Sequence, residues 1–290
     1  MEVATVGVVG AGTMGRGIAQ VFAVAGYHVI LYDVDESIVD EAMFHIGQRL
    51  AARARNARLA HEESEKALKR IRVAGDLSLL KDSDLVIEAV PEDMALKKQV
   101  LAQLEAICGE RTIFATGTSG FSVTELARAT KFPERVIGLH FFHPVPVMQL
   151  VEVIRGAQTD QETFETAMGI VEEIGKTAIA VQDSPLFVVN RILVPMLNEA
   201  IFVLQDGLAS KYDIDAGMKL GANHPVGPLA LADMVGLDTL LAVSESLLAE
   251  TGDTKYRPPL LLRQMVRAGK LGRKSGEGFY TYRDGVSDAP

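Results

Sequence analysis

Cysteine is almost missing from the sequence, because Cys108 is the only one among 290 residues. An intramolecular disulfide needs two cysteines, so none can form, and a cysteine-rich metal site is excluded for the same reason. Cys108 ends an amphipathic stretch, and we interpret it as a small residue of the core.

The sequence also lacks an excess of positive charge and any apolar run long enough to span a membrane. The net charge is −9 and the pI is about 5.2, whereas a general nucleic-acid binder needs a basic face for the phosphate backbone. No basic segment precedes the apolar stretch that begins near Ala4, so a removable signal is not expected. We therefore expect a cytoplasmic protein that binds neither nucleic acid nor membrane.

A strand, a glycine-rich turn and a helix follow one another near the start of the sequence. Thr5 to Val9 is predicted to be a buried strand, and the helix runs from Arg16 to Ala25. Between them stands Gly10-Ala11-Gly12-Thr13-Met14-Gly15. Gly10 permits a tight turn, Gly12 lets the backbone approach a pyrophosphate, and Gly15 lets the helix pack on the strand. We therefore predict that Gly10, Gly12, Thr13, Met14 and Gly15 contact a dinucleotide.

Asp33 follows the second predicted strand, Tyr27 to Tyr32, at about the distance from the glycines at which an acidic residue binds ribose hydroxyls. Val34 and Asp35 come next, and no arginine is present there to accept a 2′-phosphate. NAD is therefore favoured over NADP as the cofactor. The alternative is a glycine turn in an ordinary α/β domain that binds no nucleotide.

The segment from Glu36 to Ile71 is longer than a crossover helix needs and has helical composition without a strand pattern. We interpret it as a helical arm, at about residues 40–72, that leaves the sheet. Between residues 49 and 72 it has eight basic against three acidic residues, a net charge of +5 in a chain of −9. The basic residues are Arg49, Arg53, Arg55, Arg58, Lys66, Lys69, Arg70 and Arg72. Such a cluster favours a polyanionic small molecule, although each side chain can equally belong to a solvated helix face.

Two further apolar segments, Asp84 to Ile87 and Thr112 to Ala115, are predicted to be buried strands. Ligands of open α/β sheets bind at the carboxyl ends of their strands. Glu92 and Lys97, after the first segment, are therefore candidates for cofactor contacts. Ser119, after the second, can hydrogen-bond a substrate oxygen, while Ser122 and Glu125 resemble a capping box for the next helix.

The apolar stretch from Val136 to Glu152 contains the strongest candidate for catalysis, His140. His143 is three residues further and would face the other way on a strand, and Pro144 and Pro146 indicate that the strand ends near Phe142. Glu152 lies on the next apolar strand, which a short turn can return antiparallel, so a His–Glu pair can form. A buried histidine bonded to a backbone carbonyl is the alternative, and a metal site of His140, His143 and a carboxylate is disfavoured because the spacing splays the ligands.

A helix from Gln161 to Ile174 and a strand from Thr177 to Val181 complete the predicted first domain, residues 1–184. Residues 185–290 show helical patterns only, beginning with a very apolar helix that carries Asn190. We therefore predict a Rossmann-type, mainly parallel α/β domain followed by a smaller all-α domain. The apolar helical domain is expected to complete its core against a second copy, which predicts a homodimer.

The chain resembles the L-3-hydroxyacyl-CoA dehydrogenase family over essentially its whole length, and most of all its short bacterial members that act on 3-hydroxybutyryl-CoA. The residues that carry the resemblance are Gly10 to Gly15 with Asp33, Glu88 to Glu92, His140-Phe141-Phe142, Pro146-Val147-Met148 with Leu150-Val151-Glu152, Val189-Asn190-Arg191, Leu197-Asn198-Glu199-Ala200, Ala222 to Gly227, and Gly276-Glu277-Gly278-Phe279-Tyr280.

The resemblance implies a role for each candidate residue. His140 would be the general base, Glu152 would orient it, and Ser119 and Asn190 would hold the substrate oxygen. Glu92 and Lys97 match cofactor-contacting positions, and the basic arm matches a segment that clasps CoA, with Arg49, Arg53 and Arg55 as the first candidates. The implied reaction is the NAD-dependent interconversion of (S)-3-hydroxyacyl-CoA and 3-ketoacyl-CoA, with an acyl-CoA as the partner.

The sequence departs from the family pattern at three positions, with Gly117 and His143 where asparagine is usual and Leu186 where glycine is usual. We interpret these departures as a change in pocket shape, because Ser119, His140, Glu152 and Asn190 are all retained. Two alternatives stay open. The chain can be a dehydrogenase of a free 3-hydroxy acid or sugar acid, or a non-catalytic, crystallin-like or cofactor-sensing member of the fold.

Overall fold

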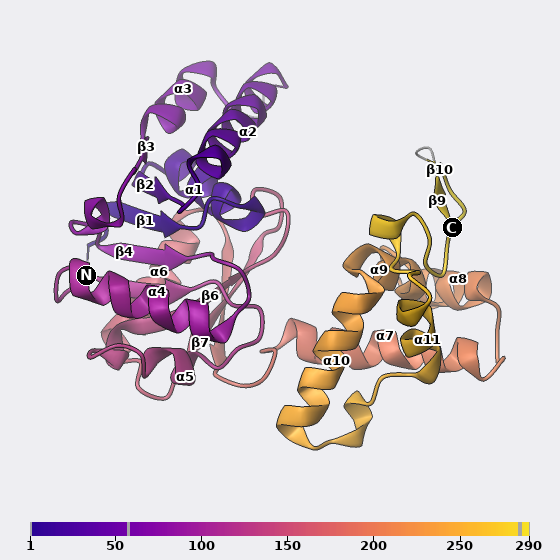
Figure 1. Cartoon of the computed structure of the whole chain (residues 1–290). Helices are drawn as coiled ribbons and strands as arrows, with labels where there is room; N and C mark the ends of the chain where they lie inside the picture. Colours follow the sequence, from indigo (N-terminus) through magenta and orange to yellow (C-terminus); the bar gives the residue numbers. More distant parts are fainter. Residues whose placement is uncertain (1, 57–58, 284–285, 290) are drawn as a thin grey trace. The chain divides into compact units, whose positions relative to one another are not determined.

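The computed structural model of the chain describes residues 2–56, 59–283 and 286–289. It divides into two compact units, Met1–Phe187 and Val188–Pro290 (Figure 1). No helix in the described part of the chain is long and apolar enough to cross a membrane.

An eight-stranded sheet forms the centre of the first unit, in the order β3-β2-β1-β4-β5-β6-β7-β8. Its strands are β1 (Thr5–Val9), β2 (His28–Tyr32), β3 (Ile71–Val73), β4 (Leu85–Glu88), β5 (Ile113–Thr116), β6 (Val136–Phe141), β7 (Leu150–Arg155) and β8 (Thr177–Gln182). All neighbouring strands are parallel except β6 and β7, which are antiparallel. The central strands are apolar and buried, as expected of a parallel sheet covered on both faces.

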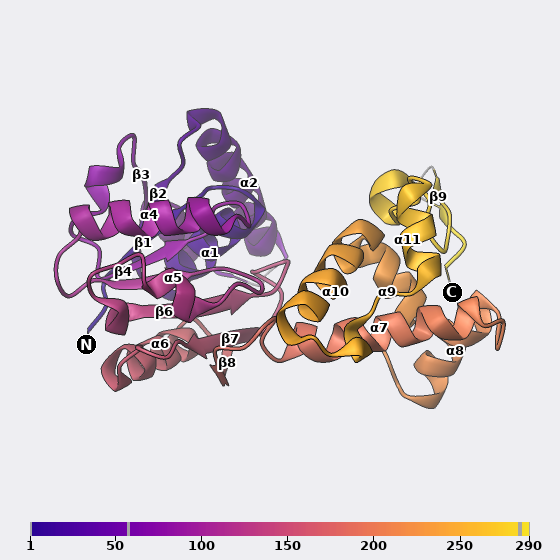
Figure 2. The same ribbon diagram turned by 60° about the horizontal axis from the view of Figure 1, so that its bottom comes forward.

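Helices cover both faces of this sheet. They are α1 (Thr13–Ala25), α2 (Glu36–Arg55), α3 (His61–Lys69), α4 (Met94–Ile107), α5 (Val123–Ala127) and α6 (Gln161–Glu173). The cores on the two faces place α1, α2, α3 and α6 on one side and α4 and α5 on the other, and Figure 2 shows α4 and α5 together on their face. α2 and α3 lie side by side at the β2–β3 end of the sheet, where the basic arm was predicted (Figure 1).

The short strand β3 was not predicted, because residues up to Ile71 were interpreted as helical. It pairs with β2 at the edge of the sheet through three residues, of which only Ile71 is buried. An edge strand this short shows little of the apolar pattern on which a strand prediction depends. The Rossmann-type, mainly parallel sheet itself is confirmed.

The second unit consists mainly of helices. They are α7 (Val189–Gln205), α8 (Lys211–Gly221), α9 (Pro228–Val235), α10 (Leu237–Thr251) and α11 (Leu260–Arg267). The described residues near the C-terminus add one small hairpin, β9 (Tyr282–Arg283) with β10 (Val286–Ser287), which was not predicted. The prediction of a smaller helical part after the sheet is confirmed, with this hairpin as its only correction among the described residues.

Two buried carboxylates hold the second unit together. Asp215 of α8 accepts hydrogen bonds from the N–H groups of Leu229 and Ala230 at the start of α9, at 2.8 and 3.0 Å. Asp233 of α9 accepts from the N–H groups of Phe279 and Tyr280, each at 2.9 Å. Helix starts and turns leave N–H groups without intrahelical partners, and these carboxylates satisfy them.

Candidate active site

The loop after β1 is shaped by its glycines. Gly10 has φ +97°, a conformation that favours glycine, and a Cβ on Gly15 would overlap the carbonyl oxygen of Gly10. Gly12 precedes α1, whose first N–H groups receive no side-chain cap, and a Cβ on Gly12 would project into open space. Because the first N–H groups of α1 have no side-chain cap and nothing crowds the backbone at Gly12, this helix start fits the pyrophosphate of a dinucleotide.

Asp33 lies beside this loop, at the end of β2. Its carboxylate accepts a hydrogen bond from the N–H of Ala11 at 2.7 Å and another from the N–H of Asp35 at 3.2 Å. These bonds orient Asp33 next to the glycine turn, where the ribose of NAD is expected. Thr13 is exposed at the first position of α1, and Met14 follows it. The donor set and the open loop therefore fit an NAD molecule.

His140 and Glu152 form the pair that the sequence allowed. They are directly opposite in the β6–β7 register, and His140 Nδ1 lies 2.6 Å from Glu152 Oε2. His140 is 4% exposed and Glu152 is fully buried. The carboxylate occupies Nδ1, so Nε2 is the ring nitrogen that can exchange a proton with a substrate. The alternative of a histidine held by a backbone carbonyl is replaced by this arrangement.

Two aromatic rings flank His140. The ring of Phe142 lies 4.5 Å from the imidazole and that of Phe187 lies 5.6 Å away, measured between centroids. Phe187 and its neighbour Leu186 both have φ of 59°, a strained conformation for residues with side chains. The Leu186 side chain covers Gly120, next to Ser119, and a Cβ on Gly120 would overlap it. The departure at Leu186 therefore places an apolar side chain against the loop of Ser119.

A pocket lies among four segments that carry predicted site residues or adjoin them. Its lining comes from α1, the loop after β4, the loop after β5, and β6, namely Met14, Ile18, Ala89, Val90, Glu92, Gly117, Ser119, Leu139 and Phe141. Gly117 contributes no side chain to it, and its N–H donates to the carbonyl of Glu88 at 2.8 Å. Glu92 and Ser119 thus share one cavity with Met14 of the glycine motif. Leu139 and Phe141, the two neighbours of His140 in β6, also line this cavity.

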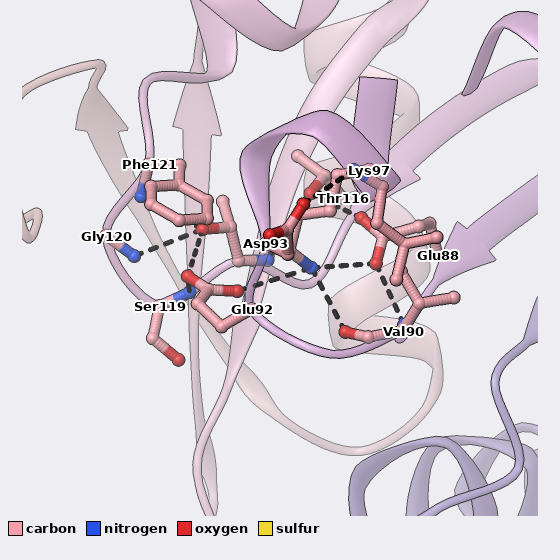
Figure 3. A network of polar contacts seen from close by, with 11 residues as sticks. Glu88, Val90, Glu92, Asp93, Lys97, Thr116, Ser119, Gly120 and Phe121 are labelled. Carbon is pink, nitrogen blue, oxygen red and sulfur yellow. Dashed lines mark hydrogen bonds and ion pairs between the residues drawn. The ribbon is translucent and has the colours of Figure 1, made fainter. Parts of the chain in front are cut away.

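Glu92 joins this pocket to a polar network (Figure 3). The Lys97 side chain is 1% exposed, and its ammonium pairs with Glu88 at 2.7 Å and with Glu92 at 3.3 Å. The prediction that Lys97 contacts the cofactor stays a prediction, and the structure adds that Lys97 holds Glu92 in place. Glu88 was not among the predicted site residues. Its signal in the sequence was a carboxylate ending an otherwise apolar strand, nine residues before a lysine.

The remaining predicted residues lie away from this pocket or on the second unit. Arg49 and Arg55 are exposed on α2 and Arg53 is half-buried there, and within the described residues none of the three forms an ion pair. Arg58, counted in the basic cluster, lies outside the described residues. Asn190 is in the first turn of α7. His143 is exposed in the turn after β6, and the described residues contain no cluster suited to a metal ion.

Comparison with known proteins gives close matches over the whole chain. Residues 5–184 match the family model described as 3-hydroxyacyl-CoA dehydrogenase, NAD binding domain, and residues 187–282 match that of its C-terminal domain. A probable 3-hydroxybutyryl-CoA dehydrogenase of Bacillus subtilis is 47% identical over 99% of this chain and 100% of that protein. The crystal structure of (S)-3-hydroxybutyryl-CoA dehydrogenase from Ralstonia eutropha has a TM-score of 0.96 and 50% identity, covering 98% of this chain and 100% of that one.

Proposed function

The chain belongs to the 3-hydroxyacyl-CoA dehydrogenase family, and from this premise we propose that its substrate is a short-chain acyl-CoA, 3-hydroxybutyryl-CoA. It is an NAD-dependent oxidoreductase that interconverts (S)-3-hydroxyacyl-CoA and 3-ketoacyl-CoA. The observation that supports the site assignment best is the buried His140–Glu152 pair, whose neighbours in β6, Leu139 and Phe141, line a pocket together with Glu92 and Ser119.

In the proposed mechanism His140 Nε2 accepts the proton of the substrate 3-hydroxyl group. Glu152 holds the imidazole in one tautomer through Nδ1 and stabilises the imidazolium that forms. Bound NAD supplies the acceptor for the hydride that leaves C3. The Ser119 hydroxyl donates a hydrogen bond to the substrate oxygen, and the same role for Asn190 stays a prediction. In the reverse direction His140 returns the proton to the 3-keto oxygen.

Substrate comparison tests this proposal most directly. Purified protein is expected to oxidise NADH with acetoacetyl-CoA, and to do so far more slowly with NADPH or with free acetoacetate. Equal activity with free acetoacetate would overturn the CoA assignment and favour the free 3-hydroxy acid alternative. Absence of turnover with every 3-keto substrate would favour the non-catalytic alternative.

We propose that Arg49, Arg53 and Arg55 on α2 bind the phosphates of CoA. A pocket between α2 and α3, lined in part by Leu50, Arg55, Ser64 and Leu68, lies in the same arm. Replacing the three arginines with alanine is expected to raise the KM for acetoacetyl-CoA about tenfold at low salt and to leave the KM for NADH unchanged.

Lys66 provides the matched control for this test. It is a basic residue of the same arm, but its ammonium already pairs with Glu62 at 2.8 Å and with Glu63 at 3.2 Å. Lys66→Ala is expected to leave the KM for acetoacetyl-CoA within about twofold of its original value. A clear rise in the KM for acetoacetyl-CoA with Lys66→Ala would show that the arm acts through its overall charge rather than through the three arginines.

We also propose that the protein is a homodimer and works in the cytoplasm, as predicted from the sequence. The second unit exposes a set of large apolar side chains that supports association: Val188, Ile192, Leu208, Leu220, Met234, Val235 and Leu260. Sedimentation equilibrium is expected to give twice the chain mass of 31.3 kDa. A mass of one chain at micromolar concentration would contradict the dimer.

A further inference from the structure

Glu92 binds the loop that carries Ser119 with one of its carboxylate oxygens. Oε1 accepts hydrogen bonds from the Thr118 hydroxyl at 2.5 Å and from the Ser119 N–H at 2.9 Å. Thr118 is fully buried, and its hydroxyl oxygen also accepts from the N–H groups of Gly120 and Phe121, at 3.2 and 2.9 Å. Four consecutive residues of the loop are therefore fixed around one hydroxyl and one carboxylate.

The other oxygen of Glu92, Oε2, contacts the ammonium of the buried ion pair Glu88–Lys97. Lys97 Nζ lies 3.3 Å from Glu92 Oε2 and 2.7 Å from Glu88 Oε1. Glu88 is fully buried and accepts two further bonds, from the Val90 N–H at 2.9 Å and from the Thr116 hydroxyl at 2.8 Å. Since Glu88 and Thr116 end adjacent strands, the position of Glu92 is tied to the sheet itself.

This arrangement leaves the Ser119 hydroxyl on the far side of its residue from Glu92. Figure 3 shows the Ser119 N–H turned toward the Glu92 carboxylate and the hydroxyl pointing away from it. Ser119 is exposed and lines the same pocket as Glu92. A backbone N–H held by a carboxylate thus fixes the Cα–Cβ bond from which the Ser119 hydroxyl extends, although the hydroxyl itself is not part of the network.

We propose that Glu92 is a positioning residue for the substrate: it fixes Ser119 through the backbone, supported by Thr118 and by the buried Glu88–Lys97 pair, so that the Ser119 hydroxyl points to the substrate oxygen. This inference rests on the proposed role of Ser119. It assigns to Glu92 a role on the substrate side of the pocket, in addition to the cofactor contact that the sequence predicts. It also gives the pair Glu88–Lys97 a reason to be buried, since pre-organised donors act best when their support is rigid.

Thr118 offers a test that removes one hydroxyl. Thr118→Val keeps the shape of the side chain but loses the bond to Glu92 and the acceptor for Gly120 and Phe121, whereas Thr118→Ser keeps the hydroxyl. With saturating NADH, Thr118→Val is expected to lower kcat/KM for acetoacetyl-CoA about tenfold and to leave the Kd for NADH within about twofold. Thr118→Ser is expected to stay within about threefold of the original protein. Equal losses in both variants, or none in Thr118→Val, would overturn the proposal.

Glu92 itself provides a second test, because its side chain is 42% exposed. Glu92→Gln keeps an oxygen acceptor for Thr118 and Ser119, and Glu92→Ala removes it. With saturating NADH, Glu92→Ala is expected to lose about tenfold in kcat/KM for acetoacetyl-CoA, and Glu92→Gln about threefold or less. An effect of Glu92→Ala confined to the KM for NADH would mean that Glu92 serves the cofactor alone, and would overturn the proposal.

Ser119→Ala separates this inference from the proposed function. If Ser119→Ala lowers kcat/KM for acetoacetyl-CoA while Glu92→Ala and Thr118→Val do not, the role of Ser119 stands and the positioning role of Glu92 fails. If Ser119→Ala is as active as the original protein, the proposed role of Ser119 fails, whatever the other variants do.

Discussion

Both units bury carboxylates, but they surround them with different partners. In the first unit Glu152 faces the imidazole of His140 and Glu88 faces the ammonium of Lys97. In the second unit Asp215 and Asp233 accept hydrogen bonds from backbone N–H groups and tyrosine hydroxyls. A carboxylate paired with an ionisable side chain at the carboxyl end of a sheet can serve chemistry, whereas one bonded to the backbone serves folding. Replacing them should therefore affect activity in one unit and stability in the other.

His140→Gln is expected to have the largest effect and to fall on activity alone. Removing the general base should lower kcat by about 10³- to 10⁴-fold, because no other group takes the substrate proton. The Kd for NADH and the midpoint of urea unfolding should change little, since glutamine fills a similar volume in β6. If the variant kept substantial turnover, the buried His140–Glu152 pair of the first unit would not serve catalysis, and His140 would have no role in the mechanism.

Glu152→Gln should have the next largest effect. The amide oxygen can still accept from Nδ1–H, but the negative charge that stabilises the imidazolium is lost, so kcat is expected to fall about 10²-fold, the low end for assistance to proton transfer. The midpoint of urea unfolding should stay the same or rise, because a buried charge is removed. A variant that loses stability but not kcat would mean that Glu152 resembles the carboxylates of the second unit.

Asp215→Asn is expected to act in the opposite way. Asparagine replaces one carboxylate oxygen with an NH₂ group, which faces hydrogen-bond donors. The Leu229 N–H donates to one of the two oxygens, and the Ala230 N–H and the Tyr280 O–H donate to the other. Leaving a buried donor without an acceptor should lower the free energy of unfolding by about 2 kcal/mol. Urea unfolding measures this loss, and kcat with acetoacetyl-CoA below the unfolding range should stay within about twofold. A loss of kcat at unchanged stability would contradict the assignment.

Asp233 gives the smallest and most specific prediction, a dependence on pH. Burial raises the pKa of Asp233 above its ordinary value of 3.8, and the nearby Asp215 raises it further, against hydrogen bonds from Tyr280, Phe279 and Tyr282. As the pH rises above 3.8, the unfolded chain therefore releases this proton more readily than the folded protein. The contribution of Asp233 to stability is present below 3.8 and is lost as the pH rises through the folded pKa.

Asp233→Asn isolates this dependence, because asparagine does not ionise. The free energy of unfolding of the original protein, minus that of Asp233→Asn, should decrease as the pH is raised from about 4 toward neutrality. Urea unfolding of both proteins at each pH measures the difference, and titrating groups that do not interact with Asp233 cancel. A difference that grows with pH would mean that the hydrogen bonds, rather than burial, dominate the pKa of Asp233.

Much of this could be predicted from the sequence where the determining residues are close along the chain. The glycine turn and Asp33 are separated by few residues, and their order alone predicted the dinucleotide loop. The His140–Glu152 pair could be predicted because two apolar strands and a short turn allow only a few arrangements. The burial of Glu88 and Lys97 could not, since it depends on Thr116, 28 residues beyond Glu88.

The start of α5 shows the same limit on a smaller scale. Ser122 does cap Glu125 N–H, at 3.2 Å, as predicted. The reciprocal half of the capping box is absent, because the Glu125 carboxylate pairs with Lys98 at 2.5 Å. Asp183, some sixty residues away, accepts instead from the Val123 and Thr124 N–H groups, at 3.1 and 2.8 Å. Local sequence predicts that a helix begins, but not which distant side chain completes its first turn.

The antiparallel pairing of β6 and β7 has a consequence for how this protein can change. Main-chain bonds of the ladder, rather than the turn between the strands, hold His140 opposite Glu152. Substitutions at exposed positions of the turn, such as the histidine at position 143, can therefore accumulate while the proton-transfer pair keeps its geometry. A shift of the ladder by one residue would instead send Glu152 to the other face of the sheet. The exposed positions of the turn are thus the natural place to diversify in directed evolution, and the register of the ladder is what a library must preserve.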